Sequence, residues 1–205
     1  KMKRFLKLLI LIIIPILLAT FVNLEAKAIL KKEVKKMKKT VVIVIASKNF
    51  RDKELFDTKK SLDKGGINTV IASSTLNKVT GVEGNTVQPD ILLKDVNMDK
   101  YDAIAFIGGI GSKEYWDDPT AHKVAKQAYD NGKIVAAICM APVTLAKAGL
   151  LNGKKFNVWE SEVETIKNLG GRYYPEPVVV DGKIVTGPNA DAALAFGQKI
   201  AEMLK

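Results

Sequence analysis

The sequence predicts an α/β fold in which a mostly parallel sheet carries helices on both faces. Strand-like runs alternate with helix-like segments throughout residues 40–205, and such alternation is typical of parallel strands joined by crossover helices. Several of the strand-like runs are continuously apolar and rich in β-branched residues, which indicates strands buried on both faces. Residues 40–205 are enough for a single domain with one core.

The first half of this domain alternates strand and helix patterns around glycine turns. Residues 52–64 have helical spacing, with Leu55, Phe56 and Leu62 on one side, and two glycines follow them. Residues 79–87 contain Gly81 and Gly84, which favour a hairpin. In chain order we expect a strand at 40–46, a helix at 52–64, a strand at 67–72, a hairpin at 79–87 and a strand at 102–107.

The second half continues the same alternation. Ser161 and Glu164 have the spacing of a capping box at a helix start, and an Asp-Gly pair at 181–182 is typical of a tight hairpin turn. The expected elements are a helix at 120–129, a strand at 133–138, a helix at 141–148, a short strand at 155–159, a helix at 161–169, a hairpin at 178–185 and a closing helix at 191–204.

The positive charge of the chain belongs to its N-terminal extension. Residues 1–39 contain 11 of the 32 Lys and Arg residues but only 2 of the 22 Asp and Glu residues, which leaves 21 basic and 20 acidic residues in the domain. The domain therefore has no excess of positive charge with which to bind nucleic acid. A single cysteine excludes an internal disulfide, and no Cys/His cluster suggests a metal; we expect no cofactor.

Residues 1–28 have the pattern of a signal peptide or an N-terminal membrane anchor. A positive start precedes an apolar stretch at 8–22, which is short beside the roughly 20 residues of a spanning helix, and small residues follow at a cleavage-like spacing. Residues 29–39 are a basic linker, and residues 40–205 are the domain. We expect an exported or membrane-anchored protein, with membrane association through 1–28, or a cytoplasmic one if this segment has no targeting role.

Distinctive residues follow three of the predicted strands. The loop at 46–52, the pair Gly108-Gly109 and Cys139 all stand at carboxyl ends of strands, where ligand sites of such sheets lie. Cys139 joins a buried strand directly to a helix, as in a nucleophile elbow, and a helix N-terminus favours a thiolate. The alternative is a small buried cysteine with a packing role.

Three segments resemble the ThiJ/PfpI family, a branch of the class I glutamine amidotransferase-like superfamily. They are FIGG at 106–109, AICMAP at 137–142 and VVVDGK at 178–183, and the resemblance extends over residues 40–205. It implies a flavodoxin-like three-layer sandwich, a homo-oligomer, and Cys139 as the reactive nucleophile. It further implies that the backbone N–H groups of Gly109 and Met140 form an oxyanion site.

The family also has a Glu near the end of the first loop that hydrogen-bonds the cysteine. An ungapped match places Arg51 at this position, with Asp52 and Glu54 as the nearest acids. Arg51 and Glu54 are three residues apart and would share one face of a helix. Two roles stay open: Arg51 stabilises the thiolate, or Glu54 supplies a carboxyl for proton transfer. The alternative is a solvated, charged helix start.

The chain lacks the histidines of several family members. Met140 stands where protease-like members have His, and Trp159 stands near the place of a second His in deglycase-like members. The sole histidine, His122, is expected on a helix surface or at a helix cap, so no Cys-His dyad is expected. Further expectations concern Asp191 as a helix-stabilising charge, and Tyr115 and Trp116 as pocket walls or dimer contacts.

By this resemblance, the first hypothesis is a stress-response glyoxalase or deglycase. Its partner would be a small carbonyl such as methylglyoxal or a carbonyl-modified protein, attacked by the Cys139 thiolate. The second hypothesis is a redox sensor or chaperone-like protein that uses oxidation of Cys139. The third is a cysteine peptidase, which the absence of a catalytic His disfavours.

Overall fold

The computed structural model describes residues 38–205. The predicted signal peptide or anchor at 1–28 lies outside the described residues, as does most of the basic linker at 29–39. Within the described part, no helix has both the length and the apolar character needed to cross a membrane.

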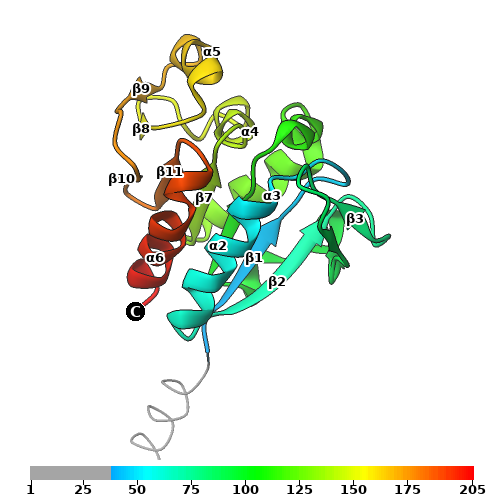
Figure 1. Ribbon diagram of the computed structural model, residues 1–205. Helices are drawn as coiled ribbons and strands as arrows, with labels where there is room; N and C mark the ends of the chain where they lie inside the picture. The colour runs from blue at the N-terminus through cyan, green and yellow to red at the C-terminus, as the bar shows by residue number, and fades with distance from the viewer. Residues whose placement is uncertain (1–37) are drawn as a thin grey trace, which may run out of the picture. The chain divides into compact units, whose positions relative to one another are not determined.

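A seven-stranded, mostly parallel sheet forms the centre of the domain, as the sequence predicts (Figure 1). Its strands lie in the order β10-β11-β7-β6-β1-β2-β5, and only β10 runs antiparallel, to β11. The strand bounds are β1 Thr40–Val44, β2 Asn68–Ser73, β5 Ile91–Leu92, β6 Ala103–Phe106, β7 Ile134–Ile138, β10 Val179–Asp181 and β11 Ile184–Gly187. The central strands β1, β6 and β7 are almost wholly buried, because helices cover both of their faces.

Alternate residues of these strands enter two separate apolar layers. Val42 and Val44 of β1 pack in the layer that contains α3 (Pro119–Asp130), α4 (Pro142–Lys147) and α5 (Val163–Asn168). Val41 and Ile43 pack in the layer that contains α2 (Asp52–Lys64) and α6 (Ala193–Met203). The two-residue period of a strand thus produces a three-layer sandwich (Figure 1).

Two small two-stranded sheets and several 3-10 helices lie in the segments between the main strands and helices. The predicted hairpin is present as β3 (Val79–Thr80) paired with β4 (Thr86–Val87). The short strand predicted at 155–159 ends at residue 156: β8 (Lys155–Phe156) pairs with β9 (Arg172–Tyr173) in a separate sheet. Five 3-10 helices were not predicted; they are η1 Leu93–Asp95, η2 Met98–Lys100, η3 Ile110–Tyr115, η4 Glu160–Glu162 and η5 Ala190–Ala192.

The predicted capping box at Ser161 is wrong. The α-helix α5 begins two residues later than the sequence pattern suggests, after the turn η4, and its N-cap residue Glu162 makes no side-chain cap. The Ser161 hydroxyl instead donates to the Glu162 carboxylate, 3.0 Å away. The competing local hydrogen bond therefore replaces the expected contact with Glu164.

The packing between α6 and the sheet predicts a large effect of one substitution. Phe196 of α6 is fully buried, whereas Phe56 of α2 is 43% exposed. Phe196→Ala removes a buried ring and leaves a cavity, so it should lower the free energy of unfolding by about 3–5 kcal/mol. Phe56→Ala is the matched control and should cost far less. Urea unfolding followed by circular dichroism measures both, and equal losses would contradict this account of the core.

Candidate active site around Cys139

Cys139 occupies a strained turn between β7 and α4. Its φ of +60° lies in the left-handed region that residues with a side chain rarely adopt. Neighbouring backbone holds it there: the Cys139 N–H donates to the Gly187 carbonyl, and the Cys139 carbonyl accepts from the Trp159 N–H, both at 2.9 Å. The Trp116 indole also donates to the Met140 carbonyl at 3.1 Å. These contacts fix the direction in which the thiol points.

Glu54, in the first turn of α2, faces Cys139. Its side chain is buried, and one oxygen, Oε2, accepts from the Gly108 N–H at 2.9 Å. The carboxyl and the Cys139 thiol also act on each other's pKa, and Oε1 is buried without a hydrogen-bond partner among the described residues. Arg51 instead pairs with Glu83, its Nε 3.2 Å from the carboxylate. Of the two arrangements left open by the sequence, the structure has the one in which Glu54 reaches the thiol.

Two glycines allow these groups to approach. A Cβ on Gly108 would lie 2.5 Å from the Cys139 Cβ and 2.8 Å from Glu54 Oε2. Gly109 has a φ of +92°, and a Cβ there would lie 2.5 Å from the Arg51 nitrogen. The backbone N–H groups of Gly109 and Met140 both act on the Cys139 sulfur and favour its thiolate form. The absence of side chains at Gly108 and Gly109 is therefore a condition of the site.

Burial controls how the pair ionises. It raises the pKa of Glu54 to about 7, against the opposing effects of the hydrogen bonds from Cys139 and Gly108 and of the Arg51 charge. Burial and then the Glu54 charge raise the pKa of Cys139 to about 12, although the N–H groups of Gly109 and Met140 act the other way. The backbone donors at the start of α4 favour a thiolate, as expected of a helix N-terminus, but desolvation of the thiolate has the larger effect on the thiol pKa.

The two groups titrate as one system. The pair holds two protons below a pH of about 7 and one proton above it, since a carboxylate and a thiolate in contact repel each other. The one proton that the pair keeps above this pH is held either by the Cys139 sulfur or by the Glu54 carboxyl. The Gly108 N–H favours a carboxylate on Glu54, whereas the N–H groups of Gly109 and Met140 favour a thiolate beside a neutral Glu54. In the second form, the Glu54 carboxylic acid is ready to donate a proton.

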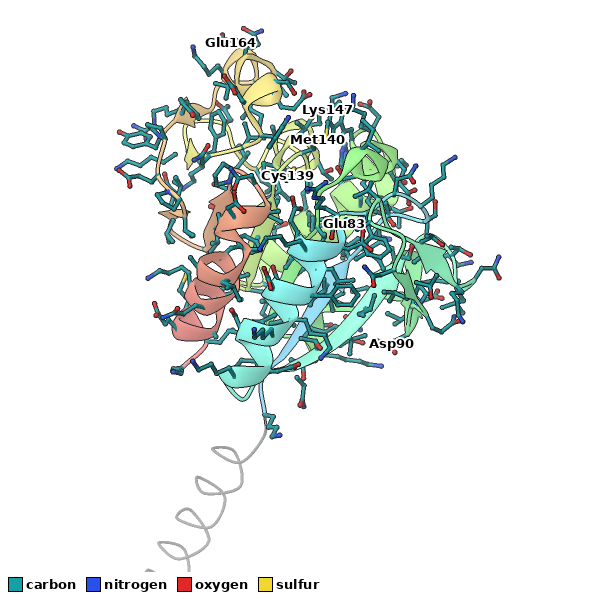
Figure 2. All side chains as sticks on the ribbon, viewed as in Figure 1. Glu83, Asp90, Cys139, Met140, Lys147 and Glu164 are labelled. Atoms are coloured by element: carbon teal, nitrogen blue, oxygen red, sulfur yellow. The ribbon has the colours of Figure 1, made fainter. Side chains whose placement is uncertain are left out.

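Cys139 opens into a cavity of about 540 Å³ at the carboxyl ends of the strands. Figure 2 labels Cys139, Met140 and Glu83 on the ribbon in this region. The cavity is lined by Arg51, Lys53, Glu54, Val82, Gly109, Ile110, Cys139, Met140, Trp159, Asn189, Ala190 and Asp191. The loop after β1, the Gly108-Gly109 pair and Cys139 therefore converge, as expected. Val82, Ile110 and Asn189 were not predicted, because no local pattern marks them.

Comparison with known proteins assigns the domain to a family. Residues 39–203 match the model of the DJ-1/PfpI family. The chain belongs to the DJ-1/PfpI family. This confirms the ThiJ/PfpI resemblance and the flavodoxin-like fold.

Individual DJ-1/PfpI proteins are similar over most of their length. An uncharacterized protein, MJ0967, of Methanocaldococcus jannaschii is 39% identical over 80% of this chain and 82% of its own. Deglycase TK1284 of Thermococcus kodakarensis is 29% identical over 80% of this chain and 99% of its own length. Glutathione-independent glyoxalase DJR-1.2 of Caenorhabditis elegans is 25% identical over 82% of this chain and 89% of its own length. The crystal structure of a ThiJ/PfpI domain protein from Brachyspira murdochii has a TM-score of 0.79 at 30% identity. The match covers 82% of this chain and 97% of that protein.

Within this DJ-1/PfpI domain, the sole histidine has a role outside the Cys139 cavity. His122 Nε2 is hydrogen-bonded to the Trp116 carbonyl at 2.8 Å, and His122 is not among the cavity residues. Trp159 lines the cavity instead. Among residues 38–205, no group of His, Cys, Asp and Glu side chains has the arrangement of a metal site. The ionisable side chain that the described residues place beside the thiol is the carboxyl of Glu54.

Neither loop aromatic lines the Cys139 cavity, so the expectation that Tyr115 and Trp116 form its walls is wrong. Tyr115 is buried in the core, where its hydroxyl donates to the Ile45 carbonyl at 2.9 Å and accepts from the Ser74 N–H at 3.0 Å. It therefore does not wall the Cys139 cavity.

Asp191 lies in the first turn of η5, and the cap of that turn is Asn189, whose side chain accepts from the N–H groups of Asp191 and Ala192.

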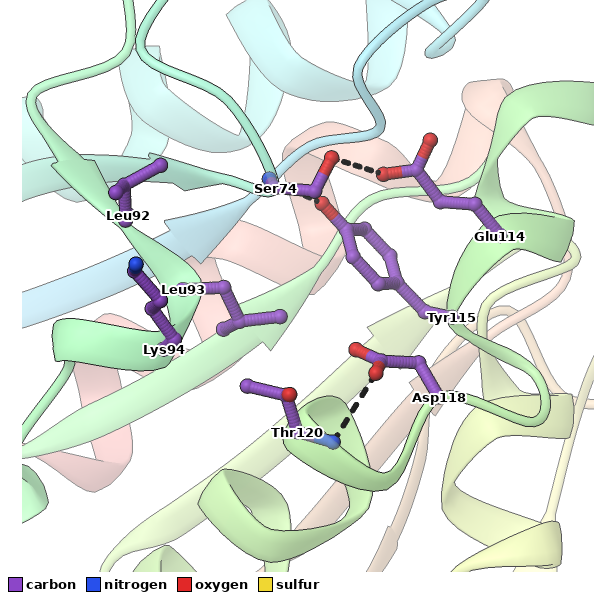
Figure 3. Close-up of a pocket in the computed structure, with 8 residues that line it drawn as sticks. All are labelled: Ser74, Leu92, Leu93, Lys94, Glu114, Tyr115, Asp118 and Thr120. Carbon is purple, nitrogen blue, oxygen red and sulfur yellow. Dashed lines mark hydrogen bonds between the residues drawn. The ribbon is translucent and has the colours of Figure 1, made fainter.

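A second cavity, of about 420 Å³, lies between β5, η1 and the segment from η3 to α3 (Figure 3). Its acidic side chains have structural roles. Glu114 accepts from the hydroxyls of Ser47 and Ser74, and Asp118 caps α3 through the Thr120 and Ala121 N–H groups. These hydrogen bonds hold loop ends together and leave both carboxylates with structural partners.

The shared proton predicts the pH dependence of Cys139 reactivity. In the wild type, the rate of alkylation by iodoacetamide should rise with a midpoint near pH 7, where the pair loses its first proton. In Glu54→Gln this step is lost, since the thiol must ionise alone in a buried site. Because the Glu54 charge is one cause of the raised thiol pKa, the rate in this variant should keep rising above pH 7, exceed the wild-type rate there and have its midpoint at a higher pH. Asp191→Asn, an exposed acid of the same cavity, is the control, and identical profiles for wild type and Glu54→Gln would contradict the coupling.

The same carboxyl makes stability depend on pH. Glu54 has a folded-state pKa of about 7 against an unfolded value of 4.5, so the folded protein binds more protons in this interval. The free energy of unfolding should therefore be highest below pH 4.5 and decrease by about 3 kcal/mol as the pH rises through 7. Glu54→Gln should lack this decrease. Urea unfolding of both proteins between pH 4.5 and 8 tests the sign, and parallel curves would refute it.

Proposed function

We propose that this chain is a Cys139-dependent enzyme of the deglycase or glyoxalase type, acting on small reactive carbonyls or on their protein adducts. The observation that carries the proposal is the buried carboxyl of Glu54 in contact with the Cys139 thiol. This arrangement provides a nucleophile and an acid at one point of a cavity. The names of the relatives, a deglycase and a glyoxalase, support the choice of a carbonyl substrate.

The first step follows from the groups present. The Cys139 thiolate forms a C–S bond with the aldehyde carbon, and the π electrons of the carbonyl move to its oxygen. Because the N–H groups of Gly109 and Met140 face the sulfur, the new oxyanion lies within their reach. The neutral Glu54 carboxylic acid then transfers its proton to this oxygen. The product is a hemithioacetal beside a Glu54 carboxylate, so charge and protons balance.

The overall reaction of an α-oxoaldehyde is internally balanced as well. Conversion to an α-hydroxyacid oxidises the aldehyde carbon, reduces the neighbouring ketone carbon and adds one water molecule. No external oxidant is consumed. The Glu54 carboxylate left by the first step is a base in contact with the hemithioacetal, and its pKa near 7 suits proton transfer in both directions.

A peptidase is disfavoured by the same geometry. A Cys-His dyad needs an imidazole beside the thiol, and the only histidine of the chain is bonded to the Trp116 carbonyl. The redox-sensor hypothesis uses Cys139 without turnover, and the kinetic test below separates it from an enzyme. Export or membrane anchoring through residues 1–28 and assembly into a homo-oligomer remain part of the proposal, on the sequence pattern and the family resemblance.

Methylglyoxal consumption tests the proposal. The wild type should convert methylglyoxal to lactate, Cys139→Ala should reduce the rate to background, and Glu54→Gln should lower kcat by about a hundredfold or more. His122→Ala is the control and should retain the wild-type rate, because His122 lies outside the cavity lining. Wild-type protein without turnover on methylglyoxal or on a glycated peptide, but with Cys139 oxidised to sulfinate by peroxide, would sink the enzyme proposal in favour of the sensor.

A further inference from the structure

Exposed apolar side chains gather at the rim of the Cys139 cavity. Val82, Ile110 and Trp159 are 41%, 52% and 45% exposed, and all three line this cavity. They come from three separate places: the turn between β3 and β4, the first residue of η3 and the residue before η4. A single exposed apolar residue is ordinary, but a cluster around a reactive group marks a binding surface. We refer to these three side chains as the apolar rim.

The backbone beneath the apolar rim is held in place. The Val82 N–H donates to the Phe50 carbonyl and the Trp159 N–H to the Cys139 carbonyl, each at 2.9 Å. The turn that carries Val82 is also clamped by Asp52, which is fully buried and accepts from the N–H groups of Glu83 and Asn85 at 2.8 and 2.9 Å. Side chains on so fixed a backbone are preorganised to contact a ligand.

The charges at the rim disfavour an anionic group on the ligand. Arg51 is paired with Glu83 at 3.2 Å, and Lys53 is paired with Asp57 at 2.6 Å. Asp191 adds a negative charge to the cavity lining, which repels an anion. The surface left to bind a substituent of the substrate is therefore the apolar rim.

The cavity is also large for the smallest carbonyls. Its volume of about 540 Å³ lies in the range of about 300–1,000 Å³ that is typical of sites for drug-sized ligands. Methylglyoxal carries only a methyl group beyond its two carbonyls. A molecule of that size in contact with Cys139 leaves the rim side chains exposed to water, whereas a larger apolar substituent covers them.

We propose that Val82, Ile110 and Trp159 are specificity residues that bind an aryl or branched alkyl substituent of an α-oxoaldehyde while its aldehyde carbon meets Cys139. This inference rests on the proposed carbonyl chemistry of the site and adds the substrate class to it. Apolar contact at the rim removes water from both surfaces and directs the aldehyde toward the thiol. The preferred substrates are therefore glyoxals with bulky apolar groups rather than methylglyoxal.

The kinetic test compares phenylglyoxal with methylglyoxal. For the wild type, kcat/KM should be higher for phenylglyoxal, and the ratio of the two values should fall about tenfold in Val82→Ser/Ile110→Ser. Leu76→Ser is the matched control: Leu76 is 47% exposed and does not line the cavity, so the ratio should stay at the wild-type value. Thermal unfolding of each variant verifies that the substitutions leave the fold intact.

A second readout does not depend on turnover. Cys139 is the only thiol, so the ratio of its alkylation rates by N-phenylmaleimide and N-ethylmaleimide reports apolar binding at the rim directly. This ratio should also fall in the double variant. No glyoxal turnover together with a lowered maleimide ratio would overturn the enzyme proposal and retain the apolar rim. Unchanged ratios in both assays would overturn the rim.

Analytical ultracentrifugation separates a substrate site from a contact between two copies. The sedimentation coefficient should be the same for wild type and Val82→Ser/Ile110→Ser. A wild-type dimer that dissociates in the double variant would show that the rim binds a second copy of the chain, and the proposed specificity role would then be wrong.

Discussion

The electrostatic interaction between the buried Glu54 carboxyl and the Cys139 thiol, which meet beside Gly108, is the one on which the rest of the site depends. Both groups are acids, and neither readily carries a charge inside the domain. Burial raises the pKa of Glu54 to about 7, and the interaction with the Cys139 thiol acts in the opposite direction. The surrounding backbone donors then decide which of the two holds the remaining negative charge. The reactivity that we propose for Cys139 at neutral pH rests on this competition rather than on a single activated residue.

The parallel sheet is what brings the two groups together. Cys139 follows β7, Gly108 follows β6, and the loop to Glu54 follows β1, and these three strands are adjacent. Their carboxyl ends form one edge of the sheet, as in other open α/β sheets. Gly108 lies between the thiol and the carboxyl, and its missing side chain leaves the space in which they meet. The strained φ of Cys139 is retained because its backbone N–H is hydrogen-bonded to the Gly187 carbonyl and its carbonyl to the Trp159 N–H.

The absence of a histidine beside the thiol distinguishes this chain within the pattern that its sequence resembles. Imidazole has a pKa near neutrality without special surroundings, whereas a carboxyl reaches that range only through burial. Here the protein obtains a neutral-pH acid by enclosing Glu54 within the domain. The position near which the family pattern has a second His carries Trp159, a side chain suited to apolar contact. Trp159 in place of a histidine thus removes an acid–base group from the site and adds an apolar side chain to the cavity lining.

Much of the architecture was predictable from the sequence because it rests on local patterns. The helix at Asp52–Lys64 has the predicted limits, since a leucine-rich face and the terminal glycines are local features. Both hairpins and the longer strands were found for the same reason, whereas the two-residue strands β5 and β9 were missed. The predicted helix at 161–169 was less accurate, because a local hydrogen bond between Ser161 and Glu162 and the turn η4 replace its first residues. The buried position of Tyr115 was missed, since aromatic residues are common both in loops and in cores.

The sequence by itself determined the fold class and the place of Cys139 at the end of a strand. Only the tertiary structure decided between Arg51 and Glu54. Their spacing implied a shared helical face, but Arg51 is the extended residue before the helix, and its side chain points to Glu83 instead. The ionisation of the thiol was likewise decided by the tertiary structure. Desolvation depends on what surrounds a group in space, and no local pattern records how deeply α2 buries Glu54 against Cys139.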